Sequence, residues 1–76
     1  MITIATDVGI RLQQLRKSRN ISQEKFAFIC GLDRTYISSI ENGKRNVTIL
    51  SLLKICNSLD ISIYDFFNSD QFKRNG

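Results

Sequence analysis

Residues 22–43 read SQEKFAFICGLDRTYISSIENG, and this segment carries the clearest structural pattern in the chain. Ser22 followed by Gln-Glu-Lys and then apolar residues is typical of a capped helix start, so a helix is expected from about Gln23. It is expected to end near Cys30, because Gly31 can adopt the backbone conformation of a sharp turn. Ala27 is small enough to let a second helix pack closely at this point.

A second helix is predicted from Arg34 to about Asn42, with Asp33 as its N-cap. Ile37 and Ile40 lie three residues apart and are expected to face inward. The stretch is therefore helix, tight turn, helix. DNA-binding proteins use this arrangement to hold the second helix outward, where it fits a major groove about 12 Å wide.

The rest of the chain has helical periodicity as well, so the fold class is expected to be all-α with five helices. A first helix is predicted from about Asp7 to Ser18, capped by Thr6 or Asp7 and followed by Asn20 in a left-handed conformation. Its apolar stripe consists of Val8, Leu12 and Leu15.

Two further helices are predicted after the basic loop. Thr48 is expected to cap a helix over about residues 49–59, and Ser62 a short one that includes Tyr64, Phe66 and Phe67. The 76 residues indicate a single domain with a core over residues 7–67 and a polar tail over 68–76 that is expected to fray. A chain of this size is marginally stable alone, so a partner subunit would help.

The composition points to a polyanion partner and away from catalysis. Eleven Lys and Arg against seven Asp and Glu give a net charge of +4, and histidine, the commonest general base and metal ligand, is absent. Cys30 and Cys56 form no C-x-x-C pair and are expected to be reduced core residues, with a disulfide as the alternative. We expect no enzyme activity, cofactor, metal, small-molecule ligand or membrane segment, and a cytoplasmic location.

The expected DNA contacts come from the helix-turn-helix and the loop that follows it. Arg34 can pair with the O6 and N7 atoms of guanine, and Thr35 and Ser38 can contact a thymine methyl group or a base edge. Contacts to the sugar-phosphate backbone are expected from Gln23, Tyr36, Ser39, Lys44, Arg45 and Asn46. Each feature taken alone is more typical of an ordinary solvated surface, and the interpretation depends on their order and spacing.

The sequence resembles the lambda-repressor-like helix-turn-helix family, also called the XRE family. The resemblance spans about residues 9–67 and is carried by four motifs: Leu12-x-x-Leu15-Arg16, Ser22-Gln23-Glu24-x-Phe26-Ala27, Tyr36-Ile37-Ser38-x-Ile40-Glu41-Asn42-Gly43-Lys44-Arg45 and Thr48-Ile49-x-x-Leu52. By this resemblance, Arg16 and Glu41 are expected to form an ion pair that ties the first helix to the end of the third.

A narrower similarity is to the controller proteins of type II restriction–modification systems. It lies in residues 32–38, LDRTYIS, followed by residues 45–49, RNVTI. The resemblance implies a small homodimer that binds palindromic operators, activates at low dose, represses its own gene at high dose and delays the endonuclease until DNA is methylated. The operator sequence, the balance of activation and repression and the number of dimers per operator stay open.

A homodimer is also expected because one recognition helix reads too few base pairs to select a site in a genome. We predict an isologous interface of Ile61, Ile63 and Phe67 with part of the helix at 49–59, the alternative being a well-filled monomer core. Activation needs a polymerase contact, and Glu24 and Asp33 are candidates for the sigma subunit, although both also suit helix starts.

Three alternative functions predict different observations. A phage-type repressor or an antitoxin would share the fold, and only the neighbouring genes would separate them. A protein-interaction module would lack the steep salt dependence of a phosphate-binding protein. An enzyme is the third class, and neither a phosphate-binding glycine loop nor a metal-ligand cluster supports it.

Overall fold

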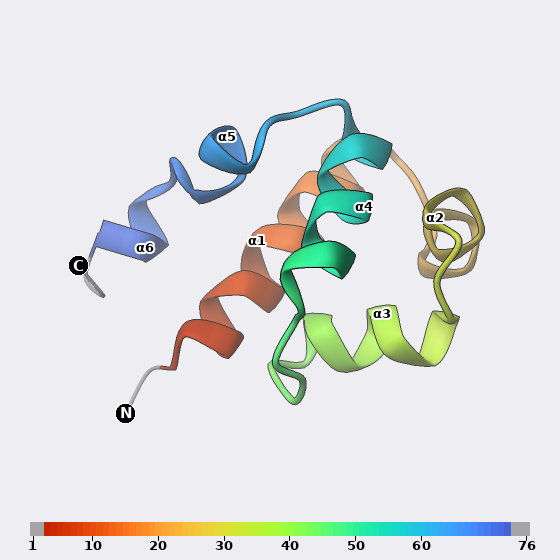
Figure 1. Ribbon diagram of the computed structural model, residues 1–76, viewed down its shortest axis with the longest axis horizontal. Coiled ribbons are helices and arrows are strands. Elements are labelled where there is room, and N and C mark those ends of the chain that lie inside the picture. Colours follow the sequence, from red (N-terminus) through yellow and green to blue (C-terminus); the bar gives the residue numbers. More distant parts are fainter. Residues whose placement is uncertain (1–2, 74–76) are drawn as a thin grey trace.

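The computed structural model describes residues 3–73, and these residues form six helices with no strand. The helices are α1 (Ile4–Ser18), α2 (Gln23–Cys30), α3 (Arg34–Glu41), α4 (Ile49–Leu59), α5 (Ile63–Phe67) and α6 (Asp70–Lys73). In Figure 1, α1 and α4 lie in the middle, α2 and α3 on one side, and α5 and α6 on the other. The all-α prediction and the helix-turn-helix at the second and third helices are confirmed.

The first helix begins earlier than predicted. Its N-cap is Thr3, whose hydroxyl accepts a hydrogen bond from the Thr6 backbone N–H at 3.2 Å, so Thr6 and Asp7 lie inside the helix. Asp7 is fully buried. The predicted cap was wrong because Thr3 is an equally good capping residue, and Ile4 and Ala5 are compatible with one more helical turn.

The other helix ends follow the sequence closely. Ser22, Thr48 and Ser62 each accept a hydrogen bond from the backbone N–H three residues later, as predicted. Asp33 occupies the N-cap position of α3, but its side chain makes no capping hydrogen bond. Asn20 has the left-handed conformation expected after α1, with φ of 56°.

The sixth helix was not predicted from the sequence. Phe72 from α6 packs against Phe67 at 4.8 Å between ring centroids and against Phe66 at 6.3 Å. The segment looked like a polar tail because a single aromatic residue in a four-residue helix creates no periodic apolar pattern. The last part of the predicted tail, residues 74–76, lies outside the described residues.

The core lies where α1, α2, α3, α4 and α5 meet. Its largest fully buried apolar side chains are Phe26, Phe66, Leu12, Ile37, Ile40 and Ile55. Gly9 lets α1 approach α3 closely, because a Cβ atom there would lie only 2.2 Å from the Ile40 carbonyl oxygen. Both cysteines are buried and free, in agreement with the first expectation.

Two arginines of α1 also tie the helices together. Arg11 donates hydrogen bonds to the carbonyl oxygens of Phe66 at 2.7 Å and Asp65 at 2.8 Å, and Arg19 donates to that of Leu59 at 3.1 Å. These carbonyls lie in the last turns of α5 and α4, where positive charge is favourable. Among residues 3–73, no helix has the length and apolar character needed to cross a membrane.

Candidate nucleic-acid interface

Helix α3 has two distinct faces. Ile37 and Ile40 are fully buried and fix the helix on the core, as the sequence predicted. On the outer face, Arg34 and Thr35 are exposed and Ser38 is half-buried. The three side chains expected to contact bases are therefore presented together near the start of one helix.

The turn between α2 and α3 sets the position of that face. Gly31 has φ of 70°, a left-handed conformation that glycine adopts without a steric penalty. The Leu32 backbone N–H then donates to the Ala27 carbonyl at 3.0 Å, which closes the end of α2. Leu32 packs against the core, so the chain enters α3 with a fixed direction.

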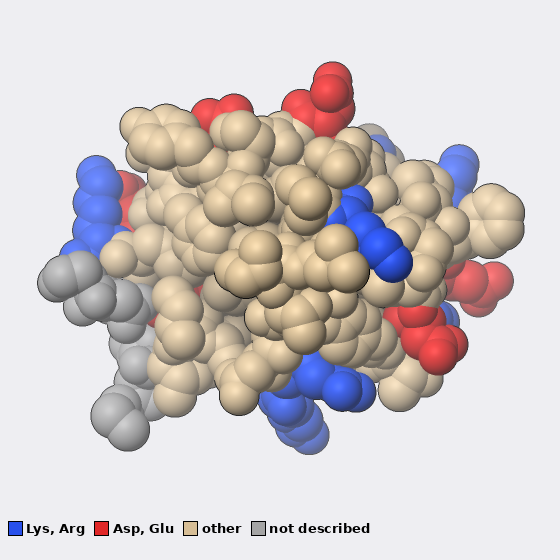
Figure 2. Space-filling model, in the orientation of Figure 1, with Lys and Arg blue, Asp and Glu red and all other residues tan. Residues whose placement is uncertain are grey.

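The loop after α3 supplies an exposed basic segment. Lys44, Arg45 and Asn46 are all exposed, and Figure 2 shows Lys and Arg side chains projecting from the lower edge of the molecule, where this loop lies. The Arg45 guanidinium lies 4.9 Å from the centre of the Tyr36 ring, a cation–π distance. This stack joins the loop to α3. It was not predicted from the sequence, because a separation of nine positions corresponds to no local pattern.

Ser39 has its hydroxyl engaged within its own helix. It donates to the Thr35 backbone carbonyl at 2.9 Å, and the residue is half-buried. A hydrogen bond from Ser39 to a phosphate would therefore require the hydroxyl proton to leave the Thr35 carbonyl, because a phosphate oxygen only accepts. Tyr36 is half-buried on the same helix.

A buried ion pair lies behind the helix-turn-helix. Arg16 and Glu41 form the bidentate pair that the resemblance implies, at 2.6 Å from Nε to Oε2 and 2.9 Å from Nη2 to Oε1. The hydrogen bond to Glu41 raises the pKa of Arg16, against the opposing effect of burial. Arg16 Nη1 also donates to the Ile21 carbonyl at 2.6 Å, which fixes the start of α2.

Gln23 is connected to this pair. Its Nε2 donates to Glu41 Oε1 at 3.1 Å, and the side chain is half-buried. A phosphate contact is predicted for Gln23 from the sequence, but its bond to Glu41 is not, since a separation of 18 positions carries no local pattern.

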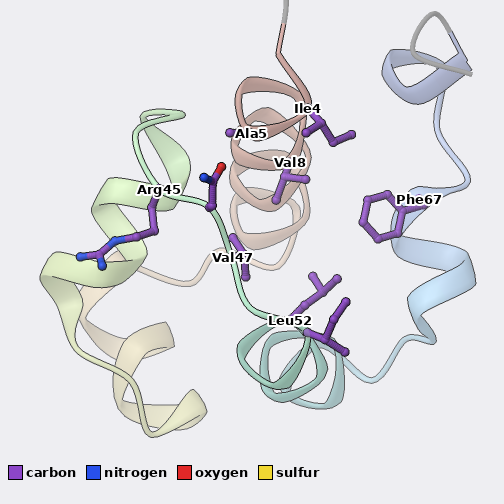
Figure 3. Close-up of a pocket in the computed structure, with 9 residues that line it drawn as sticks. Ile4, Ala5, Val8, Arg45, Val47, Leu52 and Phe67 are labelled. Carbon is purple, nitrogen blue, oxygen red and sulfur yellow. The ribbon is translucent and has the colours of Figure 1, made fainter.

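An apolar groove of about 190 Å³ opens beside the basic loop. Figure 3 shows Val8 of α1, Leu52 of α4 and Phe67 of α5 around it, while the Arg45 side chain points away toward α3. The groove was not predicted, because its walls come from four separate parts of the chain.

The residues predicted for the dimer interface are only partly available. Ile61, Ile63 and Phe67 are half-buried and pack against the core of their own chain. The more exposed apolar side chains nearby form a set that we call the α4–α5 apolar surface: Ile49, Leu50, Leu53 and Tyr64, with exposed fractions of 76, 65, 42 and 74%. Figure 2 shows few charged side chains at the centre of the face over α4.

The two acidic residues suggested for a polymerase contact are both exposed. Glu24 lies in the first turn of α2, and Asp33 lies at the N-cap of α3. Each residue stands at the start of its helix, where a negative charge is favourable, and because both are exposed their carboxylates can also reach a partner.

Comparison with known proteins places the chain in a family. The helix-turn-helix family HTH_3 matches residues 12–66, which include the whole helix-turn-helix and most of the core. The control protein C.MunI from Mycoplasma sp. is 51% identical over 61 residues, which are 79% of this chain and 82% of that protein.

Two solved structures of controller proteins are similar to this chain in both fold and sequence. The restriction–modification controller protein C.AhdI from Aeromonas hydrophila superposes with a TM-score of 0.80 at 41% identity, covering 83% of this chain and 96% of that one. The controller C.Esp1396I, solved as a tetramer with its natural 35 base-pair operator, gives 0.82 at 34% identity over 97 and 95% of the two chains. The chain therefore belongs to the XRE-type helix-turn-helix family and is similar to the controller proteins of restriction–modification systems.

Proposed function

We propose that this chain is a sequence-specific DNA-binding transcriptional regulator that binds palindromic operator DNA as a homodimer. The observation that carries the proposal is the division of α3 into a buried apolar face and an exposed face with Arg34 and Thr35. A helix held in this way can enter a major groove without disturbing the core. The role is one of binding, and we propose no catalytic activity.

The contacts divide into two kinds. Arg34, Thr35 and Ser38 would read base edges, because they lie at the N-terminal part of the outward face. The backbone of the flanking strands would be held by Gln23, Tyr36, Ser39, Lys44, Arg45 and Asn46. The Tyr36–Arg45 stack supports this division, since it holds one cation beside the recognition helix before DNA arrives.

The homodimer would use the α4–α5 apolar surface together with the exposed parts of Ile61, Ile63 and Phe67. Four large apolar side chains on α4 and α5 are 42–76% exposed, and a concentration of exposed apolar side chains is typical of interaction sites. A twofold interface there would place two copies of α3 on the same side of a duplex, at half-sites about 34 Å apart or a multiple of that spacing.

Similarity to controller proteins supports a proposal for the biological setting. We propose that the regulator acts in the cytoplasm, timing the expression of a restriction–modification system as activator and autorepressor. Exposed Glu24 and Asp33 support a contact with the sigma subunit of RNA polymerase during activation. The Glu24→Ala, Asp33→Ala double variant is expected to bind operator DNA normally but to fail to activate transcription.

The direct test is DNA binding by a variant that lacks two basic contacts. The Arg34→Ala, Arg45→Ala double variant should lose at least about a hundredfold in affinity for DNA from upstream of its own gene. Fluorescence anisotropy over a series of salt concentrations measures this, and Lys54→Ala, which removes an exposed cation on α4, is the matched control. Unchanged affinity in the double variant, or a wild-type protein that ignores DNA at low salt, would overturn the proposal.

A further inference from the structure

The buried pair of Arg16 and Glu41 continues to the DNA-facing surface through one side chain. Glu41 Oε2 accepts from Arg16 Nε, whereas Glu41 Oε1 accepts both from Arg16 Nη2 at 2.9 Å and from Gln23 Nε2 at 3.1 Å. The Glu41 side chain is 1% exposed, and that of Arg16 is 8% exposed. Gln23 is the half-buried member of the group, so it is the one that can reach solvent.

This arrangement fixes which end of the Gln23 amide faces inward. A glutamine amide has a carbonyl end that only accepts and an amine end that only donates, and rotation by 180° exchanges them. A carboxylate only accepts, so the end beside Glu41 must be the amine. Arg16 in turn holds the carboxylate with two hydrogen bonds, which leaves the carboxylate little freedom to turn away.

We infer that Glu41 is a positioning residue for DNA binding, which holds the Gln23 amide so that its second N–H is presented to a phosphate before DNA arrives. The inference rests on the proposed function, because it assigns a cause to the phosphate contact proposed for Gln23. A donor oriented in advance binds more tightly than one that must be ordered on binding. The pair at the end of α1 and α3 thus does more than connect two helices.

The first experiment observes the amide directly. In the free protein, the Gln23 side-chain proton that donates to Glu41 should exchange slowly with solvent in ¹⁵N-resolved NMR spectra. The exposed Gln13 on α1 is the internal control and should exchange quickly. On addition of a mixed-sequence duplex at low salt, the second Gln23 proton should shift while the first stays in place. Two Gln23 protons that exchange as fast as those of Gln13 would refute the inference without any variant.

The second experiment is a double-mutant cycle on affinity for the same labelled duplex. Glu41→Asp keeps the charge beside Arg16 but withdraws the carboxylate by one methylene group, about 1.5 Å. We expect Gln23→Ala to weaken binding about tenfold, and Glu41→Asp to weaken it severalfold in the wild-type background but not in the Gln23→Ala background.

The outcomes separate the two proposals. Equal losses from Glu41→Asp in both backgrounds would mean that Glu41 acts only on the fold, which overturns the inference and leaves the proposed function intact. A Gln23→Ala protein that binds as tightly as wild type would remove the phosphate contact, and the positioning role with it. A wild-type protein that does not bind the duplex would contradict the proposed function itself. If Glu41→Asp fails to fold, the NMR exchange rates decide.

Discussion

Arg16 of α1 connects two other parts of the fold. Its guanidinium uses Nε, Nη1 and Nη2 to hold Glu41 on α3 and the Ile21 carbonyl at the entry to α2. Removing it would leave a buried carboxylate without its positive partner, and such a group is costly even where the intact pair contributes little net stability.

We therefore expect Arg16→Ala to lower the free energy of unfolding by about 3–5 kcal/mol. DNA affinity should fall as well, because the start of α2 and the end of α3 lose their common anchor. Thermal and urea unfolding measure the first effect and fluorescence anisotropy the second. Lys17→Ala is the matched control, since Lys17 is exposed on the same turn and should change stability little. Unchanged melting and unchanged affinity in Arg16→Ala would contradict the prediction.

The cysteines give a second prediction for single residues. Burial raises the pKa of the Cys56 thiol above its ordinary value of 9.0, and burial does the same for Cys30 against a smaller opposing effect of Ser58. Above pH 9 the unfolded chain therefore loses these protons while the folded chain keeps them. The stabilising effect is complete below pH 9 and is lost as the pH rises further.

The free energy of unfolding should accordingly fall when the pH is raised from 8 to 10, by up to about 1.4 kcal/mol per pH unit for each thiol beyond its ordinary pKa. Urea titrations at both pH values measure the fall, which should be smaller in Cys56→Ala than in wild type. The same fall in both proteins would show that other groups cause the pH dependence.

Among the helices, α1 and α3 approach each other closely at Gly9. A Cβ atom at this position would lie 2.2 Å from the Ile40 carbonyl oxygen and 2.9 Å from that of Glu41. Both neighbours are backbone atoms, so a larger residue can be accommodated only if the helices separate.

Gly9→Ala should therefore destabilise the fold by about 1–3 kcal/mol, although alanine is the better helix former. Gly31→Ala is a comparison with a different cause: nothing lies within 4 Å of its Cβ position, so only the strain of φ at 70° opposes it. Urea midpoints of the two variants measure the costs, and Gly31→Asn should recover part of the loss at that turn. A Gly9→Ala protein as stable as wild type would contradict the close approach.

Helices and their ends were largely predictable because each depends on neighbours in sequence. Ser22, Thr48 and Ser62 cap helices as predicted, and the positions of Ile37 and Ile40 follow from helical periodicity. The early start of α1 and the helix α6 were missed, since competing caps and a single Phe72 leave no clear pattern. The site residues were nominated by the sequence, but the bond from Gln23 to Glu41 and the Tyr36–Arg45 stack depend on tertiary packing alone.

At the scale of the whole molecule, the exposed apolar side chains fall into separate regions. The α4–α5 apolar surface is the region proposed for the dimer. Phe28 is 86% exposed and lies on α2, which contributes no residue to that surface. The two regions allow a matched comparison, because a charge can be introduced in either without entering the core.

Leu50→Lys should weaken dimer formation at least about tenfold, because it buries a charge in an apolar interface while leaving the monomer fold intact. Sedimentation equilibrium at micromolar concentration measures the change. Phe28→Lys should leave the dimer unaffected. Ile61, Ile63 and Phe67 are poorer test positions, since each also packs against its own core. A wild-type protein that sediments only as a monomer would remove the dimer from the account.

The lining of the groove in Figure 3 includes two groups of residues, Arg45 and Asn46 of the basic loop, and Ile49 and Phe67 of the helices that follow. A second subunit that packs against Ile49 and Phe67 would therefore restrict the motion of Arg45 and Asn46. Dimer formation and DNA binding would then reinforce each other. For a regulator that binds DNA as a dimer, the occupancy of the operator grows with the square of the chain concentration as long as most chains are monomers. Under the proposed function, a cell that has just received the gene would therefore show a lag in operator occupancy followed by a steep rise, because few dimers form while the chain is scarce.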